Sequence, residues 1–234
     1  MEHLTFVSCV NKAEVAKSCL LASPCLAPGH GHQLILVSGM PSAGAGARWG
    51  AKLARHPWMV LLHQDVYLPE GWDVQFLAGL RAASLEFPAL AVAGVYGVRA
   101  DGSHAGHVYD RDCWLGGPLE AAERVRSLDE LLLAVRLDSG IGPDPALGWH
   151  LYGTDVCLQA EAAGLDAVVL HAPCEHRASL VREVASLNAE EKAQWQPGVD
   201  AFNASVETFC KRWSQALPVV TPMASVDEGY RLSI

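Results

Sequence analysis

The sequence predicts an α/β fold, with a mixed, mainly parallel sheet that helices cover on both faces. Apolar runs at 4–10, 32–39, 58–65 and 89–98 alternate with segments of helical periodicity. These runs are almost continuously apolar, which is typical of strands buried on both faces of a parallel sheet. Half of the 234 residues are hydrophobic, so one large domain can bury a sufficient core without disulfides.

Three segments between these strands have the spacing of helices: 12–23, 42–56 and 70–84. Pro24 and Pro28 end the first of them. The second begins loosely in a glycine-rich stretch before it becomes helical.

The second half of the chain changes character after residue 98. We expect a helix at 151–164 that ends at a glycine, and a final amphipathic helix or helix pair at 188–215. We expect a turn-rich hairpin and loop at 99–118, a turn with a short strand at 124–138 and a long loop at 139–150. A further strand and its exit follow at 165–176, and 216–222 leads to an irregular tail.

Charge and cysteine content exclude several classes of protein. The net charge of −9 and the pI of about 5.5 argue against a nucleic-acid or anionic-membrane partner. The seven cysteines form no C-x-x-C pair and several lie in apolar runs, which indicates reduced core thiols. The N-terminus lacks a basic region and no apolar run is long enough to span a membrane, so we expect a cytoplasmic protein.

The segment "VLLHQD" is the most informative local feature. It carries a buried strand directly into His63, Gln64 and Asp65. Ligands of parallel α/β sheets collect at the carboxyl ends of strands, so Asp65 lies where a site is expected. The structural alternative is that Asp65 only caps the turn before Pro69.

Five stretches together resemble the family 2 type of nucleotide-sugar glycosyltransferase, which has the GT-A fold. They are "VLLHQDV", "LDELLLAVR", "GWHLYGTDVCLQAEAAG", "HAPCEHRAS" and "FCKRW". The resemblance is greatest to a bacterial subgroup named after a streptomycin-biosynthesis protein. It implies one GT-A domain over 1–222, with a nucleotide-binding half (1–98), an acceptor and catalytic half (99–180), C-terminal helices (181–222) and a tail (223–234).

The resemblance also implies a bound Mn²⁺ or Mg²⁺. The family places D-x-D at the end of the strand that "WMVLLHQD" resembles, and its last aspartate, Asp65 here, reaches the metal. His176 in "CEHRAS" matches a later metal or phosphate contact. His63 replaces the first acid, and it could bind the metal, contact ribose or phosphate, or remain a half-buried strand residue.

The family's general base is the aspartate of an E-D pair, and Asp155 in "YGTDVC" holds that place with Thr154 before it. A transferase of this type would move a sugar from a nucleotide-sugar donor to a hydroxyl acceptor, with inversion. The structural alternative is that Asp155 only complements the dipole of the helix at its N-terminus.

The remaining site residues divide between donor and acceptor. The donor set contains no acid after the second strand, only Ser38, and it is completed by Cys9, Val10, Asn11, Arg48 and Gln64. Trp114, Trp149 and Tyr152 are candidates for the acceptor side, although tryptophans are more often core residues. His30, His32, His104 and His107 have metal-like spacing but no evident third ligand, which favours polar loops.

Two alternatives remain open. A dinucleotide-binding domain would explain the glycines of "GAGARWG" (44–50) and the position of Asp65 after them. A non-catalytic relative that binds a nucleotide or sugar, or serves as a partner protein, would explain the missing acids before Asp65 and Asp155.

Overall fold

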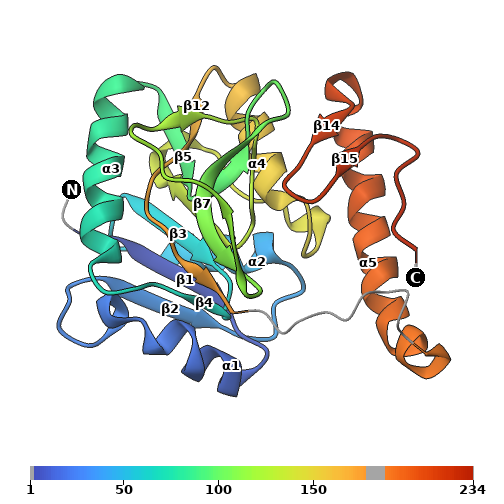
Figure 1. Cartoon of the computed structure of the whole chain (residues 1–234), viewed down its shortest axis with the longest axis horizontal. Coiled ribbons are helices and arrows are strands. Elements are labelled where there is room, and N and C mark those ends of the chain that lie inside the picture. Colours follow the sequence, from blue (N-terminus) through green and yellow to red (C-terminus); the bar gives the residue numbers. More distant parts are fainter. Residues whose placement is uncertain (1–2, 178–187, 234) are drawn as a thin grey trace.

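A seven-stranded sheet forms the centre of the molecule, which we describe from a computed structural model covering residues 3–177 and 188–233 (Figure 1). Its strand order is β2-β1-β3-β11-β5-β12-β9. Strands β1, β2, β3, β5 and β12 point the same way, whereas β11 and β9 run against them. The predicted mixed, mainly parallel sheet is therefore confirmed. The bounds are Thr5–Cys9 (β1), Gln33–Val37 (β2), Trp58–Leu62 (β3), Leu90–Gly94 (β5), Glu123–Arg124 (β9), Leu132–Arg136 (β11) and Asp166–Val169 (β12).

A second sheet has the order β10-β6-β7-β13-β4, with β8 paired to β7. The apolar run predicted as one strand at 89–98 divides between the two sheets, because β5 ends at Gly94 and β6 begins at Tyr96. The predicted hairpin at 99–118 is confirmed as β7 and β8. The bounds are Val66–Tyr67 (β4), Tyr96–Val98 (β6), His104–Asp110 (β7), Cys113–Gly116 (β8), Ser127–Leu128 (β10) and Glu175–His176 (β13).

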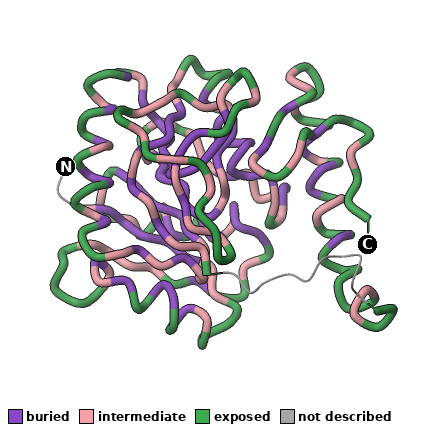
Figure 2. The backbone as a smooth tube through the Cα atoms, viewed as in Figure 1, coloured by how far each residue is buried: buried purple, intermediate pink, exposed green. Residues whose placement is uncertain are grey.

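Helices cover both faces of the central sheet (Figure 1). Alternate residues of β3 point to opposite faces, so Val60 and Leu62 belong to one core cluster and Met59 and Leu61 to another. The first cluster includes α3, and the second includes α2, α4 and α5. Buried backbone is accordingly concentrated in the central strands (Figure 2). The helices are Ala13–Ser18 (α1), Ala43–Leu53 (α2), Trp72–Glu86 (α3), Tyr152–Ala162 (α4) and Ala189–Arg212 (α5).

The first helix is shorter than the predicted 12–23. Helix α1 ends at Ser18, and two 3₁₀ turns follow it at Leu20–Ala22 and Pro24–Leu26. Pro24 disfavours helical backbone in the residue before it, and Ser23 is extended, with φ −68° and ψ 121°. The chain therefore leaves the α-helix earlier than its apolar spacing indicates.

The glycine-rich stretch 44–50 lies inside α2 rather than in a loose turn. The helix begins at Ala43 because the Ser42 hydroxyl accepts the Ala45 N–H at 3.1 Å. A side chain at Gly44 would collide with the backbone of Pro145, and one at Gly46 would collide with the Cys9 sulfur. These glycines allow close packing of α2 against neighbouring segments. They do not form the phosphate-binding turn between a strand and a helix that a dinucleotide-binding domain needs.

The C-terminal region is one helix followed by a hairpin. Helix α5 runs unbroken from Ala189 to Arg212, and Asn188 and Glu191 form a capping box at its start. The sequence predicts an irregular tail at 223–234, but β15 (Ser225–Val226) at its start pairs with β14 (Val219–Val220) in the preceding stretch. The division of the chain at residues 98, 180 and 222 stays a prediction. Among the helices of residues 3–177 and 188–233, none combines the length and apolar character required to cross a bilayer.

Candidate functional site

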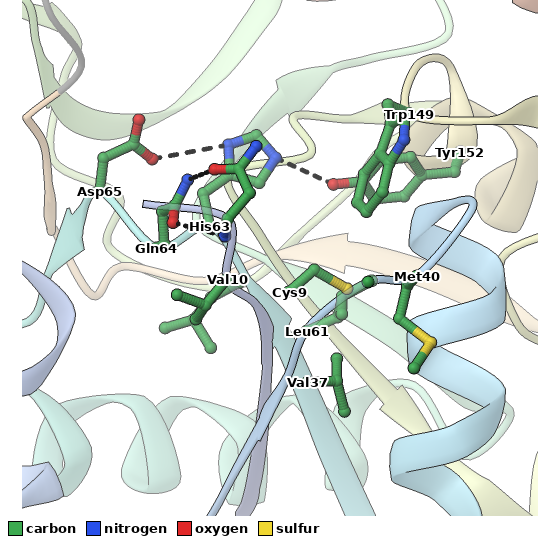
Figure 3. A pocket seen from close by; sticks show the side chains of 13 residues that line it. Cys9, Val10, Val37, Met40, Leu61, His63, Gln64, Asp65, Trp149 and Tyr152 are labelled. Carbon is green, nitrogen blue, oxygen red and sulfur yellow. Dashed lines mark hydrogen bonds and ion pairs between the residues drawn. The ribbon is translucent and has the colours of Figure 1, made fainter. Parts of the chain in front are cut away.

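A cavity of about 510 Å³ opens at the carboxyl ends of β1, β2 and β3. Its floor and one wall come from the last residues of these strands and the residues that follow them, and Trp149 and Tyr152 lie on the other side (Figure 3). This is the edge at which ligands of parallel sheets bind. The described residues that line the cavity include no lysine or arginine: Cys9, Val10, Asn11, Val37, Gly39, Met40, Leu61, Leu62, His63, Gln64, Asp65, Trp149 and Tyr152.

His63, Asp65 and His176 meet at the edge of this cavity. Asp65 Oδ1 lies 3.4 Å from His176 Nε2 and 4.0 Å from His63 Nδ1. One ligand atom from each of the three residues lies within 4.8 Å of the other two. In the described part of the chain, no other group of three histidine, cysteine or acidic residues meets this distance. We refer to these residues as the triad. Imidazole nitrogen and carboxylate oxygen are suitable ligands for divalent first-row ions.

Strand pairing brings His176 to Asp65 across more than a hundred residues. Strand β13 pairs antiparallel with β4, and His176 is opposite Val66, the residue after Asp65. The N–H of Arg177 donates to the Asp65 carbonyl at 2.8 Å, which fixes this register. His63 arrives from the exit of β3, and its N–H donates to the Leu131 carbonyl at 3.0 Å.

The charges in the triad complement one another. Burial raises the pKa of Asp65, but the hydrogen bond and charge of His176 outweigh it and lower that pKa overall. Burial lowers the pKa of His176, and the nearby Asp65 and Asp110 more than compensate, so that pKa is raised. The pKa of His63 is lowered by burial and by His176, which keeps this imidazole neutral. The triad thus supplies one carboxylate and one neutral imidazole without prior deprotonation.

Of the residues predicted to bind the donor, four line the cavity and two do not. Cys9, Val10, Asn11 and Gln64 are in its wall. The Gln64 amide accepts the N–H groups of Asn11 and Lys12 at 3.1 and 3.0 Å and donates to the Asn11 side chain at 2.6 Å, so it ties the exits of β3 and β1 together.

Ser38 and Arg48 lie outside this cavity. Ser38 is exposed in the turn between Val37 and Gly39, which do line it. Arg48 lines a different cavity of about 350 Å³, together with Asp144, Gln159 and Arg212. The structure therefore separates Arg48 from the triad, because it lies on the outer side of α2.

Asp155 does not reach the cavity either. Its side chain is fully buried, and Oδ1 accepts the Trp213 indole N–H at 2.9 Å while Oδ2 accepts the Gln159 amide at 2.6 Å. Arg212 Nε lies 3.3 Å from Oδ1. The structure therefore separates Asp155, the residue in the place of the family's general base, from Asp65 and the cavity, because the side chains of Arg212 and Trp213 at the end of α5 cover its carboxylate.

Of the three aromatic residues predicted for the acceptor side, two line the cavity and one does not. Trp149, 42% exposed, and the buried Tyr152 line the cavity. Trp114 lies on β8 of the second sheet, outside the cavity lining, and packs on His107 with ring centroids 4.4 Å apart. His104 is hydrogen-bonded to the Tyr96 hydroxyl at 3.0 Å. His104 and His107 therefore each contact an aromatic side chain, as expected for residues that are not metal ligands.

Glu130 is a carboxylate next to this site, outside the cavity lining, and no role is predicted for it from the sequence. It precedes β11 and accepts the N–H of Gly153 at 3.3 Å, at the start of α4 and beside Tyr152. Burial, followed by the charge of Asp129, raises the pKa of Glu130 to about 8. The acids in "LDELLL" have no local signal that distinguishes Glu130 from an ordinary turn residue.

This raised pKa predicts a pH-dependent stability. Between the ordinary value of 4.5 and about 8, unfolded Glu130 is ionised while folded Glu130 keeps its proton. Its contribution to stability is therefore complete below about pH 4.5 and is lost as pH rises through about 8. We expect Glu130→Gln to unfold a few degrees above wild type at about pH 8.5, with no difference near pH 4.5, in thermal melts across pH. The exposed Glu120→Gln is the control, and identical pH profiles for Glu130→Gln and wild type would contradict the prediction.

The comparisons with known proteins identify the fold. No family model matches the sequence. Residues 1–349 of TarS from S. aureus, solved in complex with UDP-GlcNAc, align with a TM-score of 0.53 and 11% identity over 88% of this chain and 67% of that one. GalNAc-T7, solved with UDP, GalNAc and Mn²⁺, aligns with a TM-score of 0.55 and 14% identity over 93% of this chain and 52% of that one. At these identities the likeness establishes the GT-A fold.

One curated protein is related at the level of sequence. It is named "ATP synthase subunits region ORF 6", from Fuscovulum blasticum, and is 31% identical over 160 residues. The match covers 60% of this chain and 61% of that protein, so the chain spans less than two thirds of the relative's length. Its name states no activity.

Proposed function

We propose that this protein is a glycosyltransferase that moves a sugar from a nucleotide-sugar donor to a hydroxyl acceptor, with a divalent cation held by the triad. The observation that carries the proposal is the position of His63, Asp65 and His176 at the edge of a strand-end cavity on a GT-A fold. A cavity of about 510 Å³ is within the range of small-ligand pockets. Membership of the family 2 subgroup, inversion, and a cytoplasmic setting are further parts of this proposal.

The cavity lining supports the need for a metal. A nucleoside diphosphate is strongly anionic, yet among residues 3–177 and 188–233 no lysine or arginine lines the cavity. A divalent cation at the triad supplies the positive charge that a departing diphosphate needs. The two solved neighbours contain UDP-GlcNAc in one case and UDP with Mn²⁺ in the other, which supports the same assignment here. Two imidazoles and one carboxylate favour Mn²⁺ over Mg²⁺.

Different residues in and beside the cavity would bind the nucleoside and accept the proton of the acceptor hydroxyl. Cys9, Val10 and Asn11 form the wall against which the nucleoside lies, and Trp149 offers an exposed ring beside it. The proton of the acceptor hydroxyl needs a base other than the enclosed Asp155. Glu130 is the candidate, since it is bonded to the cavity-lining Tyr152, although it does not line the cavity itself. Its pKa of about 8 leaves a fraction of the carboxylate ionised near neutral pH and makes that carboxylate a strong proton acceptor.

A non-catalytic nucleotide-sugar-binding protein is the second candidate. The observation that favours it is the burial of Asp155, which removes the expected base from the cavity. Such a protein would keep the triad and the cavity but would not turn over a donor.

A donor panel separates these functions. We expect UDP to bind at least about tenfold more tightly with Mn²⁺ than without it in calorimetric titrations, because the cation bridges protein and diphosphate. Incubation with UDP- and GDP-sugars and Mn²⁺ should then release nucleoside diphosphate from one of them. Binding without release identifies the non-catalytic protein, and no binding of any nucleotide with or without Mn²⁺ refutes both functions.

A further inference from the structure

In each of the two histidines, the ring nitrogen that does not face Asp65 makes a hydrogen bond, and this bond determines which nitrogen the histidine presents to Asp65. The partners in these bonds are Asp110, on β7, and Tyr152, at the start of α4. Neither residue belongs to the triad, and no metal-related role is predicted for Asp110 from the sequence. The direction of each bond follows from what its partner can donate or accept.

Asp110 orients His176. Its Oδ1 lies 2.8 Å from His176 Nδ1, and the two residues are register partners in the pairing of β7 with β13. A carboxylate only accepts, so Nδ1 carries a proton in either charge state of the ring. The neutral ring therefore presents a bare Nε2, and this is the atom that lies 3.4 Å from Asp65 Oδ1.

Tyr152 orients His63 by a similar argument. The Tyr152 hydroxyl donates to the Glu130 carbonyl at 3.2 Å, because a carbonyl oxygen can only accept. A hydroxyl has one proton, so its oxygen must accept from His63 Nε2, 2.9 Å away. The proton on Nε2 leaves Nδ1 bare, and Nδ1 is the atom that faces Asp65 at 4.0 Å. Figure 3 shows His63 between Asp65 and Tyr152.

We infer that Asp110 and Tyr152 are positioning residues that hold both imidazoles as metal ligands with their bare nitrogens aimed at one point beside Asp65. The inference rests on the proposed function, since it assigns the purpose of these bonds to a divalent cation. Histidine ligands commonly donate their second N–H to a carboxylate or another acceptor, which fixes the ring and increases its basicity. The chain supplies such partners from two elements that do not carry the ligands.

The test measures binding of Mn²⁺ alone to the full chain by calorimetry and by electron paramagnetic resonance. We expect Asp110→Ala to raise the Kd for Mn²⁺ by about 10- to 100-fold, with Asp110→Asn between this variant and wild type because an amide oxygen can still accept from Nδ1. Tyr152→Phe keeps the ring in its buried place and should raise the Kd by about tenfold. Tyr109→Phe is the matched control, since Tyr109 adjoins Asp110 on β7 but packs on Trp114, and it should bind Mn²⁺ like wild type.

A second readout reports the rings directly. In ¹⁵N spectra of the metal-free chain at a pH where both rings are neutral, His63 should be protonated at Nε2 and His176 at Nδ1, and Zn²⁺ should shift the opposite nitrogen of each. Loss of this pattern in Tyr152→Phe and Asp110→Ala, in chains that unfold cooperatively, supports the inference. Wild-type Mn²⁺ affinity in both variants overturns the inference while leaving the proposed function intact. Failure of the wild-type chain to bind Mn²⁺ overturns both.

Discussion

Replacing Asp65 by asparagine is expected to abolish Mn²⁺-dependent release of nucleoside diphosphate and to weaken Mn²⁺ binding on the order of 100-fold or more. Asp65 is the only anion of the triad, and its Oδ1 is the atom shared by the contacts to His63 and His176. Asparagine has nearly the same shape but no charge. The loss would therefore reflect the missing negative ligand rather than a cavity in the fold.

The measurement pairs donor turnover with direct titration of Mn²⁺, on variants whose thermal unfolding is first compared with wild type. Glu70→Gln is the matched control, because Glu70 is an exposed acid five residues further along the same exit from β3. It should retain both metal binding and turnover. If Asp65→Asn binds Mn²⁺ with wild-type affinity, the triad is not the metal site and the central element of the proposal is lost.

Replacing Asp155 by alanine is expected to destabilise the protein by about 1–3 kcal/mol, the usual cost of leaving a buried hydrogen-bond donor without its acceptor. Asp155 is fully buried, and three side chains contact its oxygens: Gln159, Arg212 and Trp213. Burial raises the pKa of Asp155, although the Trp213 hydrogen bond and the charge of Arg212 favour its ionised form. Alanine would leave Arg212 paired with Asp144 alone and the indole N–H without an acceptor.

Urea unfolding at neutral pH and thermal melts provide the check, with a Tm decrease of roughly 2–12 °C corresponding to that free energy. Asp138→Ala is the comparison, since Asp138 pairs with Arg136 but its side chain is 76% exposed, and exposed pairs contribute at most about 1 kcal/mol. Donor and Mn²⁺ binding should persist in the folded fraction of Asp155→Ala. A variant that is as stable as wild type, binds the donor and yet does not turn it over would restore Asp155 as the base.

The sequence alone determined most of the strands and helices and the edge at which the site lies, but not the division of 89–98 between two sheets, the early end of α1 or the β14–β15 hairpin. Strands, helices and the final helix follow from hydrophobic spacing and from proline and glycine positions, which are local properties of the chain. The exit of β3 into His63 and Asp65 follows from the same local pattern. The grouping of His176 with these two residues was also anticipated, but through family resemblance rather than through any feature of the segment around it.

Only the tertiary structure decided how distant segments meet. It placed β11 antiparallel in the middle of a parallel sheet, put Asp110 and Tyr152 behind the two histidines, and enclosed Asp155 under α5. These contacts join residues 58 or more positions apart, and periodicity carries no information about such separations. Burial depends on what packs against a residue, so the sequence around Asp155 could show a carboxylate at a helix start but not the tryptophan and arginine that cover it.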